Sequence, residues 1–279
     1  MKRTIVVVDT VWTGHVPSFH KLILAGFLDL GYSVASISPA PQDVVKYLQS
    51  KGYDSSLFIP IGFEQPTRKE RSIIHRFTGR FAHRSLWLKK IATVLEAKLL
   101  WKTTAKLISK HVHSNTKFVF FPYIDRGFAL PNLNPKWIEQ NFPFQWGGLH
   151  INGHQLQDRS SQIPLKAKNC KSVCLLDERI TDSIAQQLNK PVYCFPEVVE
   201  EQILPDKTPK LVQEIQSKAN GRKIVSLIGV LSSSKDIETL LGVIQLSSEL
   251  GKPYYFLIVG ELLLSTFPDK LQTLIQSFL

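Results

Sequence analysis

The sequence predicts an α/β protein with two Rossmann-like lobes, of which the second is incomplete. Residues 4–38 and residues 223–261 each read as a strand, a polar loop, a helix and a second strand. Strands and helices also alternate between these two segments, and this alternation is typical of parallel sheets that helices cover on both faces. We therefore expect a first domain at residues 1–199, a linker at residues 200–220, and the start of a second domain at residues 221–279. The first part of the linker is rich in charged residues and interrupted by prolines.

The first lobe opens with a strand, a helix and two more strands. Ile5–Val8 is a β-branched run with polar flanks, which indicates a strand that is buried on both faces of a sheet. A helix follows after a loop, because Leu22–Leu30 carries apolar residues at roughly helical spacing and Gly31 ends the pattern. Tyr32–Ser38 is the second expected strand, and Leu57–Ile61 is the third.

The rest of the first domain continues the alternation. Helices are expected at Leu86–His111 and Thr181–Leu188. Further strands are expected at Phe118–Phe121, Trp146–Ile151, Ser172–Leu176 and Pro191–Phe195. Asn132–Phe144 is rich in proline and asparagine, so we expect it to form a surface loop.

Composition limits the class of protein. The hydrophobic content of 43% and the charged content of 20% are those of an ordinary soluble globular protein. No apolar run approaches the ~20 residues that a membrane-spanning helix needs. The three cysteines match no zinc-binding spacing, and we expect them to be reduced, as in a cytoplasmic protein.

Positive charge is concentrated in one segment. The formal net charge of the chain is +11, and residues 67–90 contribute +7 of it. On a helical wheel the apolar residues of this segment share one face and its arginines flank them, which is typical of a helix on an anionic membrane surface. The residues expected at that surface are Arg76, Phe77, Arg80, Phe81 and Arg84. A solvated helix docked by its apolar face is the alternative, and nucleic-acid binding is the least favoured interpretation.

A polar loop in the second lobe has the character of a phosphate-binding site. It follows the apolar run Ile224–Leu231 and carries Ser233 and Lys235 where an amphipathic helix is expected to begin. The free N–H groups and the positive dipole end of a helix N-terminus attract phosphate, and Lys235 adds a full charge. The alternative is an ordinary solvated loop lysine.

The loop after the first strand is a second candidate site. Open α/β sheets bind ligands where such loops leave the strands, and His15 is therefore placed to face a crevice. Gly14 has no Cβ and permits close approach of the backbone to a ligand. The loop lacks the G-x-G-x-x-G pattern, and a dinucleotide cofactor is therefore not expected. A tight turn with a surface histidine is the alternative.

Two more candidate groups follow later strands. His150 and His154 come after a Trp-Gly-Gly sequence, and a histidine there can act as a general acid or base or can hydrogen-bond a sugar hydroxyl. Their spacing suits a metal only on a helix, which the nearby glycines disfavour, so no metal site is expected. Asp125 and Arg126 follow another strand and are candidates for the same crevice. Core or surface histidines and a local ion pair remain the alternatives.

Three segments resemble glycosyltransferases of the GT-B fold, most closely those of family 4. These segments are IVVVDTVWTGHVPSFHKL at residues 5–22, KSVCLLDERITDSIAQQLNKPVYCFPE at residues 171–197, and IVSLIGVLSSSKDIETLL with FLIVGE within residues 224–261. The resemblance implies that the second lobe binds a nucleotide-sugar donor and the first lobe binds an acceptor. It further implies transfer with retention of the anomeric configuration, without a metal or another cofactor.

The resemblance also implies roles for individual residues. The implied donor-binding residues are Gly14, Gly229, Ser233, Lys235 and Glu261, with Lys235 on the family lysine that contacts the donor diphosphate. His15 and His150 fall on or near family residues of the cleft, and together with Asp125 they are the candidate catalytic residues. The implied partners are a nucleotide-sugar donor and a glycan or lipid-linked acceptor, at the cytoplasmic face of a membrane and without nucleic acid.

The sequence departs from the family pattern in two places. Val230 follows Gly229 where the family commonly has an arginine, which removes one of two charges that stabilise the leaving diphosphate. The paired glutamates that hold the donor sugar and ribose would lie beyond residue 279, so we expect the chain to be a fragment of a longer enzyme. A nucleotide-sugar epimerase of the same fold and a catalytically incompetent binding module are the alternatives.

Overall fold

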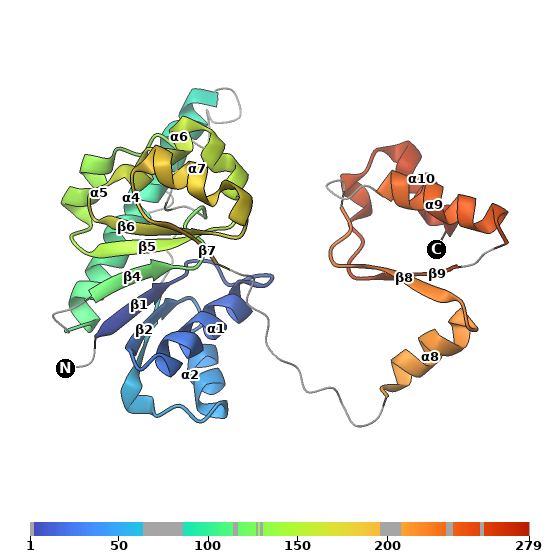
Figure 1. The fold of residues 1–279 in the computed structure, drawn as a ribbon, viewed down its shortest axis with the longest axis horizontal. Helices are drawn as coiled ribbons and strands as arrows, with labels where there is room; N and C mark the ends of the chain where they lie inside the picture. The colour runs from blue at the N-terminus through green and yellow to red at the C-terminus, as the bar shows by residue number, and fades with distance from the viewer. Residues whose placement is uncertain are drawn as a thin grey trace. The chain divides into compact units, whose positions relative to one another are not determined.

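The structure is a computed structural model in which the chain forms two compact units, Met1–Glu200 and Glu201–Leu279. It describes residues 3–63, 86–113, 117–126, 128, 131–195, 208–232, 237–251 and 254–278. Each unit is described here by itself (Figure 1).

Strands and helices alternate along both units. The strands are β1 (Thr4–Val8), β2 (Ser33–Ser38), β3 (Phe58–Gly62), β4 (Lys117–Phe121), β5 (Gln145–His150), β6 (Cys170–Leu175), β7 (Val192–Cys194), β8 (Lys223–Ile228) and β9 (Tyr254–Val259). The α-helices are α1 (Val16–Asp29), α2 (Pro41–Ser50), α4 (Leu86–His111), α5 (Pro135–Asn141), α6 (Arg159–Gln162), α7 (Glu178–Leu188), α8 (Lys210–Ala219), α9 (Ile237–Glu249) and α10 (Asp269–Phe278). Short 3₁₀ helices are η1 (Ser55–Leu57), η2 (Gly153–Gln157), η3 (Pro164–Lys166) and η4 (Leu264–Thr266).

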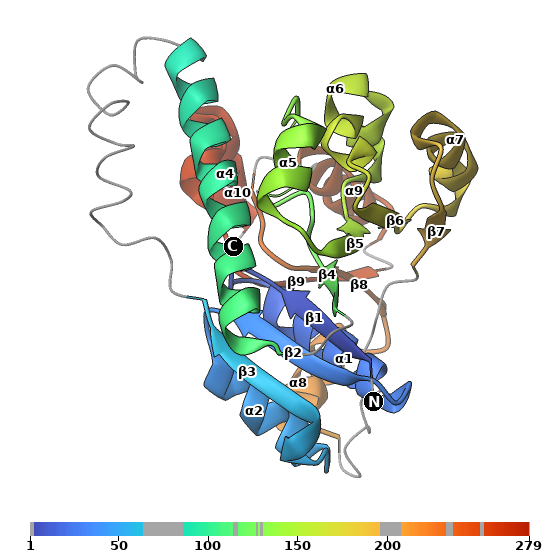
Figure 2. The same ribbon diagram turned by 90° about the vertical axis from the view of Figure 1, so that its left-hand side faces the viewer.

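The first unit is built on one parallel sheet with the strand order β3-β2-β1-β4-β5-β6-β7. Val6 of β1 lies opposite Ala35 of β2 on one side and Val119 of β4 on the other, and β1 is buried along its whole length. Helices α1 and α2 cover one face, while α4, α5 and α7 pack on the other (Figures 1 and 2). Continuous β-branched runs such as β1 suit this double burial. The predicted Rossmann-like α/β fold class is confirmed.

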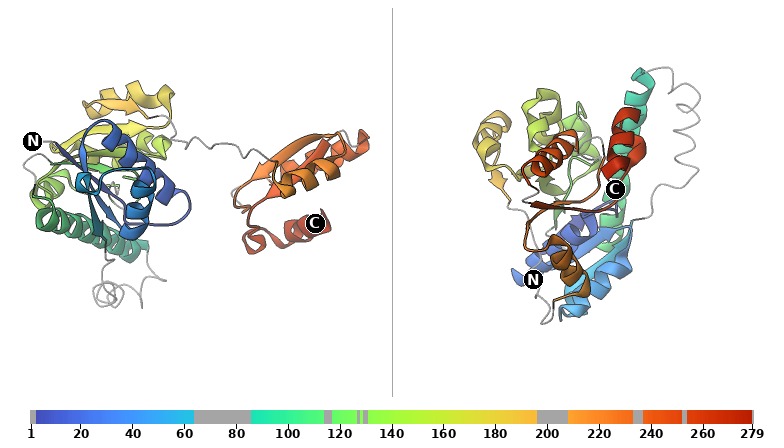
Figure 3. Two further views of the ribbon diagram at one scale, coloured as in Figure 1. Left: turned by 90° about the horizontal axis from the view of Figure 1, so that it is seen from below. Right: turned by 90° about the vertical axis from the view of Figure 1, so that its right-hand side faces the viewer.

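Helix α4 runs along the first unit for much of its height and contributes the centre of the core (Figures 2 and 3). Trp101 of α4 is completely buried, and its ring lies 4.8 Å from that of Phe142 and 5.1 Å from that of Trp146. Its Nε1 donates to the carbonyl oxygen of Phe128 at 3.1 Å. A buried indole needs such a partner, so this hydrogen bond ties the loop after β4 to the core.

The prediction that Asn132–Phe144 forms a surface loop was wrong, because Pro135–Asn141 is helix α5. The Asn134 side chain accepts a hydrogen bond from the Lys136 N–H at 2.9 Å, and Pro135 occupies the first turn. Asparagine at the N-cap and proline at the first helical position both favour a helix start. Ile138 of this short helix and Phe142 directly after it are both buried.

The second unit has a parallel two-stranded sheet, β8–β9, with α9 and α10 over one face and α8 on the other (Figures 1 and 2). Leu231, Ile237, Leu241, Phe267 and Ile275 form its small buried cluster. Much apolar surface stays open in this unit, with Ile228 71% exposed and Leu250 70% exposed. Helix α8 lies within the residues expected to form the linker.

Candidate functional site

A crevice too narrow to admit a water molecule lies at the carboxyl edge of the first sheet, between β1 and β4. The strand order reverses there, and open α/β sheets bind their ligands at such a switch point. The residues that line the crevice are Asp9, Thr10, Val11 and Val16 from the β1 side and Tyr123, Arg126 and Phe128 from the β4 side. Arg126 stacks its guanidinium 4.8 Å above the Tyr123 ring and places a positive charge beside the crevice.

His15 lies beside this crevice, at the N-terminus of α1. Its side chain is exposed, and its ring lies 5.7 Å from that of Tyr123. Gly14 precedes it with a φ of 62°, a left-handed conformation that strains residues with a Cβ. The predicted glycine turn therefore exists and presents His15 at the switch point, within reach of a ligand.

A buried hydrogen-bond chain that the sequence analysis missed supports the same loop. Asp9 follows β1 directly, and its Oδ2 lies 2.6 Å from Nδ1 of His20, whose Nε2 lies 2.8 Å from Oγ of Ser36. All three residues are buried. Burial raises the pKa of Asp9, and the hydrogen bond from His20 opposes that rise. The chain fixes α1 against β1 and β2 and thereby positions the loop that carries His15.

Asp125 and His150 form the second part of the candidate site, at the carboxyl ends of β4 and β5. Oδ2 of Asp125 accepts hydrogen bonds from the backbone N–H of Asn152 at 3.2 Å and from its side-chain Nδ2 at 2.8 Å. Oδ1 of Asp125 and Nδ1 of His150 are buried and have no partner within the described residues. Buried polar atoms without partners are uncommon in folded proteins. Both atoms are shielded from solvent, so a ligand reaches them only when the surrounding residues move.

Burial controls the charge of His150. The residue is only 1% exposed, and desolvation lowers its pKa. The negative charge of Asp125 acts in the opposite direction, while His154 lowers the pKa further. The imidazole is therefore held neutral and can either donate or accept a hydrogen bond.

Close packing of β5 against β4 sets the position of His150. A Cβ on Gly148 would lie 2.5 Å from the Phe121 carbonyl oxygen, and one on Gly147 would lie 2.7 Å from that of Ser172. Neither position can accept a side chain unless the backbone moves. The two glycines thus allow three neighbouring strands to bring their carboxyl ends together at the site.

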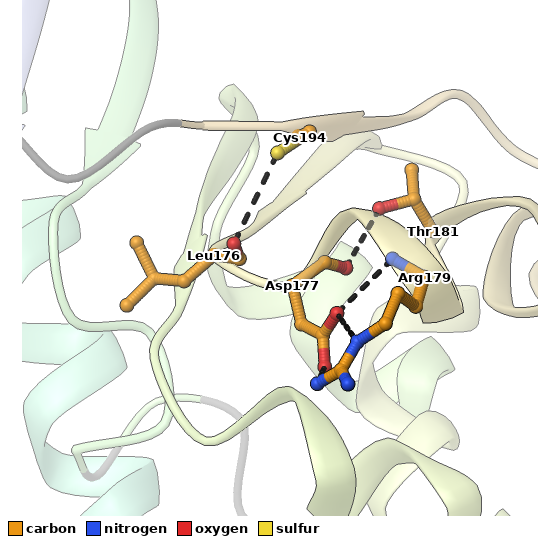
Figure 4. A network of polar contacts seen from close by, with 5 residues as sticks. All are labelled: Leu176, Asp177, Arg179, Thr181 and Cys194. Atoms are coloured by element: carbon orange, nitrogen blue, oxygen red, sulfur yellow. Dashed lines mark hydrogen bonds and ion pairs between the residues drawn. The ribbon is translucent and has the colours of Figure 1, made fainter.

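The carboxyl end of β6 carries a further charged network (Figure 4). Asp177 caps α7 by accepting from the Arg179 N–H at 3.0 Å, and it also binds the Arg179 guanidinium at 2.8–2.9 Å. These hydrogen bonds hold the pKa of Asp177 below its usual value. The Cys194 thiol lies 3.9 Å from the Leu176 carbonyl oxygen and links β7 to the same edge.

The second unit contains two of the predicted donor-binding residues. Gly229 follows β8 with a φ of 119°, and Glu261 follows β9 with an exposed side chain. The backbone N–H of Leu231 donates to the Glu261 carbonyl oxygen at 2.8 Å, so the two strand ends are joined. Gly260 has a φ of 144°, and a Cβ there would meet the Gly229 carbonyl. These glycines shape a close-packed carboxyl edge on this sheet.

Several predicted residues lie outside the part of the chain that the structure describes. They are Ser233 and Lys235 of the polar loop, and Arg76, Phe77, Arg80, Phe81 and Arg84 of the basic segment. Within the described residues no group of three or more histidine, cysteine, aspartate or glutamate side chains is arranged to hold a metal ion. No described helix is both long enough and apolar enough to cross a bilayer.

Known proteins were compared with the chain at the level of family, sequence and structure. No protein-family model matches it, and no curated protein matches its sequence. Solved structures do match, among them UGT89C1 of Arabidopsis thaliana with a TM-score of 0.51 and 15% identity over 83% of this chain and 58% of that chain. The same plant protein complexed with UDP-L-rhamnose gives a TM-score of 0.51 and 11% identity, over 94% and 71% of the two chains.

The chain has the fold of these solved structures. A glycosyltransferase from Rickettsia africae ESF-5 also matches, with a TM-score of 0.44 and 16% identity over 93% of this chain and 60% of that chain. The chain thus spans about three-fifths of the length of the first solved structures that it matches. At this level of identity the likeness establishes the fold and leaves the reaction to be argued from the site.

Proposed function

We propose that this protein transfers a sugar from a nucleotide-sugar donor to an acceptor hydroxyl. The observation that carries the proposal is the pair of buried, unpartnered atoms at the carboxyl edge of the first sheet, Oδ1 of Asp125 and Nδ1 of His150, within the described residues. A sugar hydroxyl can donate to the carboxylate and can also bond to the neutral imidazole in either tautomer. A sugar carries several hydroxyl groups, so one such ligand can offer a partner to each atom once the surrounding residues move aside.

The donor is a nucleotide-sugar held by the second unit. The carboxyl edge with Gly229 and Glu261 supports this, as does the sequence of the neighbouring loop with Ser233 and Lys235. The plant protein of the same fold has been solved with UDP, with UDP-L-rhamnose and with quercetin. By analogy the first unit of this chain binds the acceptor, which we take to be a lipid-linked glycan or a polysaccharide.

The proposed reaction needs no metal and retains the anomeric configuration. The acceptor oxygen bonds to the anomeric carbon as the bond to the donor diphosphate breaks, and the acceptor proton passes to the leaving phosphate. Asp125 and His150 then orient hydroxyl groups, while His15 contacts the reacting sugar at the switch point. Proton NMR of the first product distinguishes retention from inversion of the anomeric configuration. An inverted product would make His15 the general base that removes the acceptor proton.

The proposed location is the cytoplasmic face of a membrane, where the basic segment with Arg76, Arg80 and Arg84 meets anionic lipid. Its positive charge and apolar spacing support this placement. Sedimentation with phosphatidylglycerol vesicles tests it, and protein that stays in the supernatant at low salt would contradict it.

A donor screen tests the proposed activity. UDP-, GDP- and ADP-linked sugars are titrated by calorimetry, and nucleotide release is followed for each donor that binds. We expect His150→Ala to lower turnover at least tenfold, because the variant leaves a ligand hydroxyl without its partner. His113→Ala is the matched control, since this histidine is exposed after α4 and lies before β4, at the opposite edge of the sheet. A protein that binds no donor would refute the proposal, and one that interconverts donor sugars would be an epimerase.

A further inference from the structure

A second polar hollow lies in the first unit, away from the carboxyl edge of the sheet. It has a volume of about 600 Å³, and among its lining residues are Asn134, Lys136, Glu139, Gln140, Lys166 and Lys168. Lys166 and Lys168 come just before β6 begins, so they lie at the amino edge of the parallel sheet. Asp125 and His150 lie at the other edge. The hollow is therefore distinct from the site described above.

The segment that presents Lys166 and Lys168 is held rigidly from beneath. The ammonium group of Lys190 donates to the carbonyl oxygens of Leu165 at 2.7 Å, Cys170 at 2.9 Å and Ala167. Asn169 accepts from Nε1 of the buried Trp146 at 3.2 Å. These bonds order the backbone from which the two exposed lysine side chains extend.

Helix α5 forms the other wall of the hollow and is joined to the first. Oε1 of Glu139 accepts from the backbone N–H of Lys168 at 2.7 Å, and the Asn134 side chain accepts from the N–H of Lys136. The polar ends of Asn134 and Gln140 remain exposed at the rim. The hollow thus combines ammonium groups with amide groups on two walls of defined spacing.

The charge of this hollow is not balanced. Within the described chain, none of the ammonium groups of Lys136, Lys166 and Lys168 has a carboxylate within ion-pair distance. Glu139 supplies the only negative charge among the described lining residues. Three like charges around one hollow repel one another, and a bound anion relieves that repulsion.

More positive charge lies on the far side of α5. The ammonium groups of Lys98 and Lys102 from α4 lie 5.2 Å and 5.8 Å from the ring centroid of Trp137. Nζ of Lys171 bonds to the Lys168 carbonyl oxygen at 3.1 Å, which adds a further charge beside the hollow. Positive charge is therefore concentrated around the hollow.

We propose that the hollow binds a phosphate-bearing carbohydrate or polyol. Lys136, Lys166 and Lys168 hold the phosphate, while Asn134 and Gln140 hydrogen-bond the hydroxyl groups. A compact phosphate matches lysine ammonium groups as point charges, and hydroxyl groups match the amides. The phosphate belongs either to a soluble sugar phosphate or to the headgroup of an anionic lipid. The inference does not depend on the proposed sugar transfer.

Calorimetry with glucose 6-phosphate and with inorganic phosphate tests the proposal on the full chain, at about 50 mM salt, where screening is modest. We expect Lys166→Ser/Lys168→Ser to weaken glucose 6-phosphate binding at least tenfold, and Lys136→Ser on the other wall to weaken it severalfold. The matched control is Lys46→Ser/Lys110→Ser, which removes two exposed lysines elsewhere in the same unit and should change affinity less than twofold. Glucose 6-phosphate should also bind more tightly than inorganic phosphate.

A second assay, with lipid vesicles, identifies whether the phosphate comes from a lipid headgroup or from a soluble compound. Sedimentation with phosphatidylcholine vesicles that contain phosphatidylinositol, whose headgroup is a phosphate-bearing polyol, assigns the ligand to a lipid headgroup if the Lys166/Lys168 variant, but not the control, loses binding. Sugar phosphate binding without such vesicle binding assigns it to a soluble compound. The proposal is overturned if wild-type protein binds no glucose 6-phosphate. It is also overturned if the double variant binds like wild type, or if the control variant loses as much affinity.

Discussion

Acidification should destabilise the first unit through His150. Burial lowers the pKa of this histidine in the folded protein, where Asp125 raises it only in part and His154 lowers it further. In the unfolded chain the imidazole is solvated and takes up a proton near its ordinary pKa of about 6.5. Between that value and the lower folded pKa, the unfolded state binds one more proton than the folded state. The free energy of unfolding therefore falls as the pH falls through this window.

The size of the effect follows from one proton. At pH 5.5, about one unit below the unfolded pKa, the loss is about 1.4 kcal/mol if His150 stays neutral when folded. Urea unfolding at pH 7.5 and 5.5 measures it, with tryptophan fluorescence as the signal because all five tryptophans lie in the first unit. We expect His150→Gln to reduce the difference between the two pH values by up to about 1.4 kcal/mol, since glutamine does not titrate.

A matched variant separates burial from a general effect of pH. His113 is exposed in the folded protein, and His113→Gln should leave the pH difference as in wild type, because it removes a histidine without changing the buried surroundings of His150. If wild type and His150→Gln lose equal stability on acidification, the argument from burial is refuted. If wild type instead gains stability relative to the variant at pH 5.5, the charge of Asp125 outweighs desolvation.

Three further predictions concern stability. Gly148→Ala should cost about 1–3 kcal/mol in urea unfolding, because its Cβ would lie 2.5 Å from a backbone oxygen. Gly26→Ala in α1 should instead stabilise by about 0.5–1 kcal/mol, since a Cβ there meets no atom within 4 Å. Equal effects of the two substitutions would contradict the packing of β5 on β4. Asp177→Ala should lower the melting temperature by roughly 2–4 °C through loss of the α7 cap. Asp177→Asn should retain most of the cap's stabilisation, because asparagine is also a good N-cap residue. An equal drop in melting temperature for both variants would assign the effect to charge. Lys190→Met should cost about 2–3 kcal/mol by removing the ammonium group that donates to three carbonyl oxygens, of which the Ala167 oxygen still accepts from the Cys170 N–H. An unchanged urea midpoint would show that water replaces the ammonium group.

The candidate site was partly predictable because strand ends are visible in sequence. Gly14 and His15 follow β1, Asp125 follows β4, and His150 ends β5, and polar residues directly after apolar runs mark these positions. Parallel strands bring all their carboxyl ends to one edge, so a list of strand ends predicts which loops share a site. The sequence analysis therefore placed these residues at one edge of the sheet.

The hydrogen bonds within the site were not predictable in the same way. His20 lies on the buried side of α1 and bonds to Asp9 and Ser36, which come from two different strands. A polar residue on the buried side of a predicted helix indicates that such a network exists, but sequence spacing does not identify the residues to which it bonds. The link from Asp125 to Asn152 likewise joins two loops and depends on how β4 and β5 align.

The lysine-lined hollow shows the same division between local and distant information. Its α5 wall is encoded locally, since Asn134 and Pro135 are strong helix-start residues that the loop prediction undervalued. Its other wall approaches only because Glu139 and Lys168 are joined across 29 positions of the chain. Such contacts arise from packing, so the unbalanced charge of the hollow becomes visible only in the folded structure.

By itself the sequence determined the fold class and the places of the strands along the first unit, because apolar periodicity and turn residues act over a few neighbouring positions. Helix α4 was expected at Leu86–His111 and lies there, and each strand of the first unit falls within about two residues of its expected place. Only the tertiary structure decided which polar atoms are buried without partners, such as Nδ1 of His150. Burial depends on every segment packed around an atom, and those segments meet only when the chain folds.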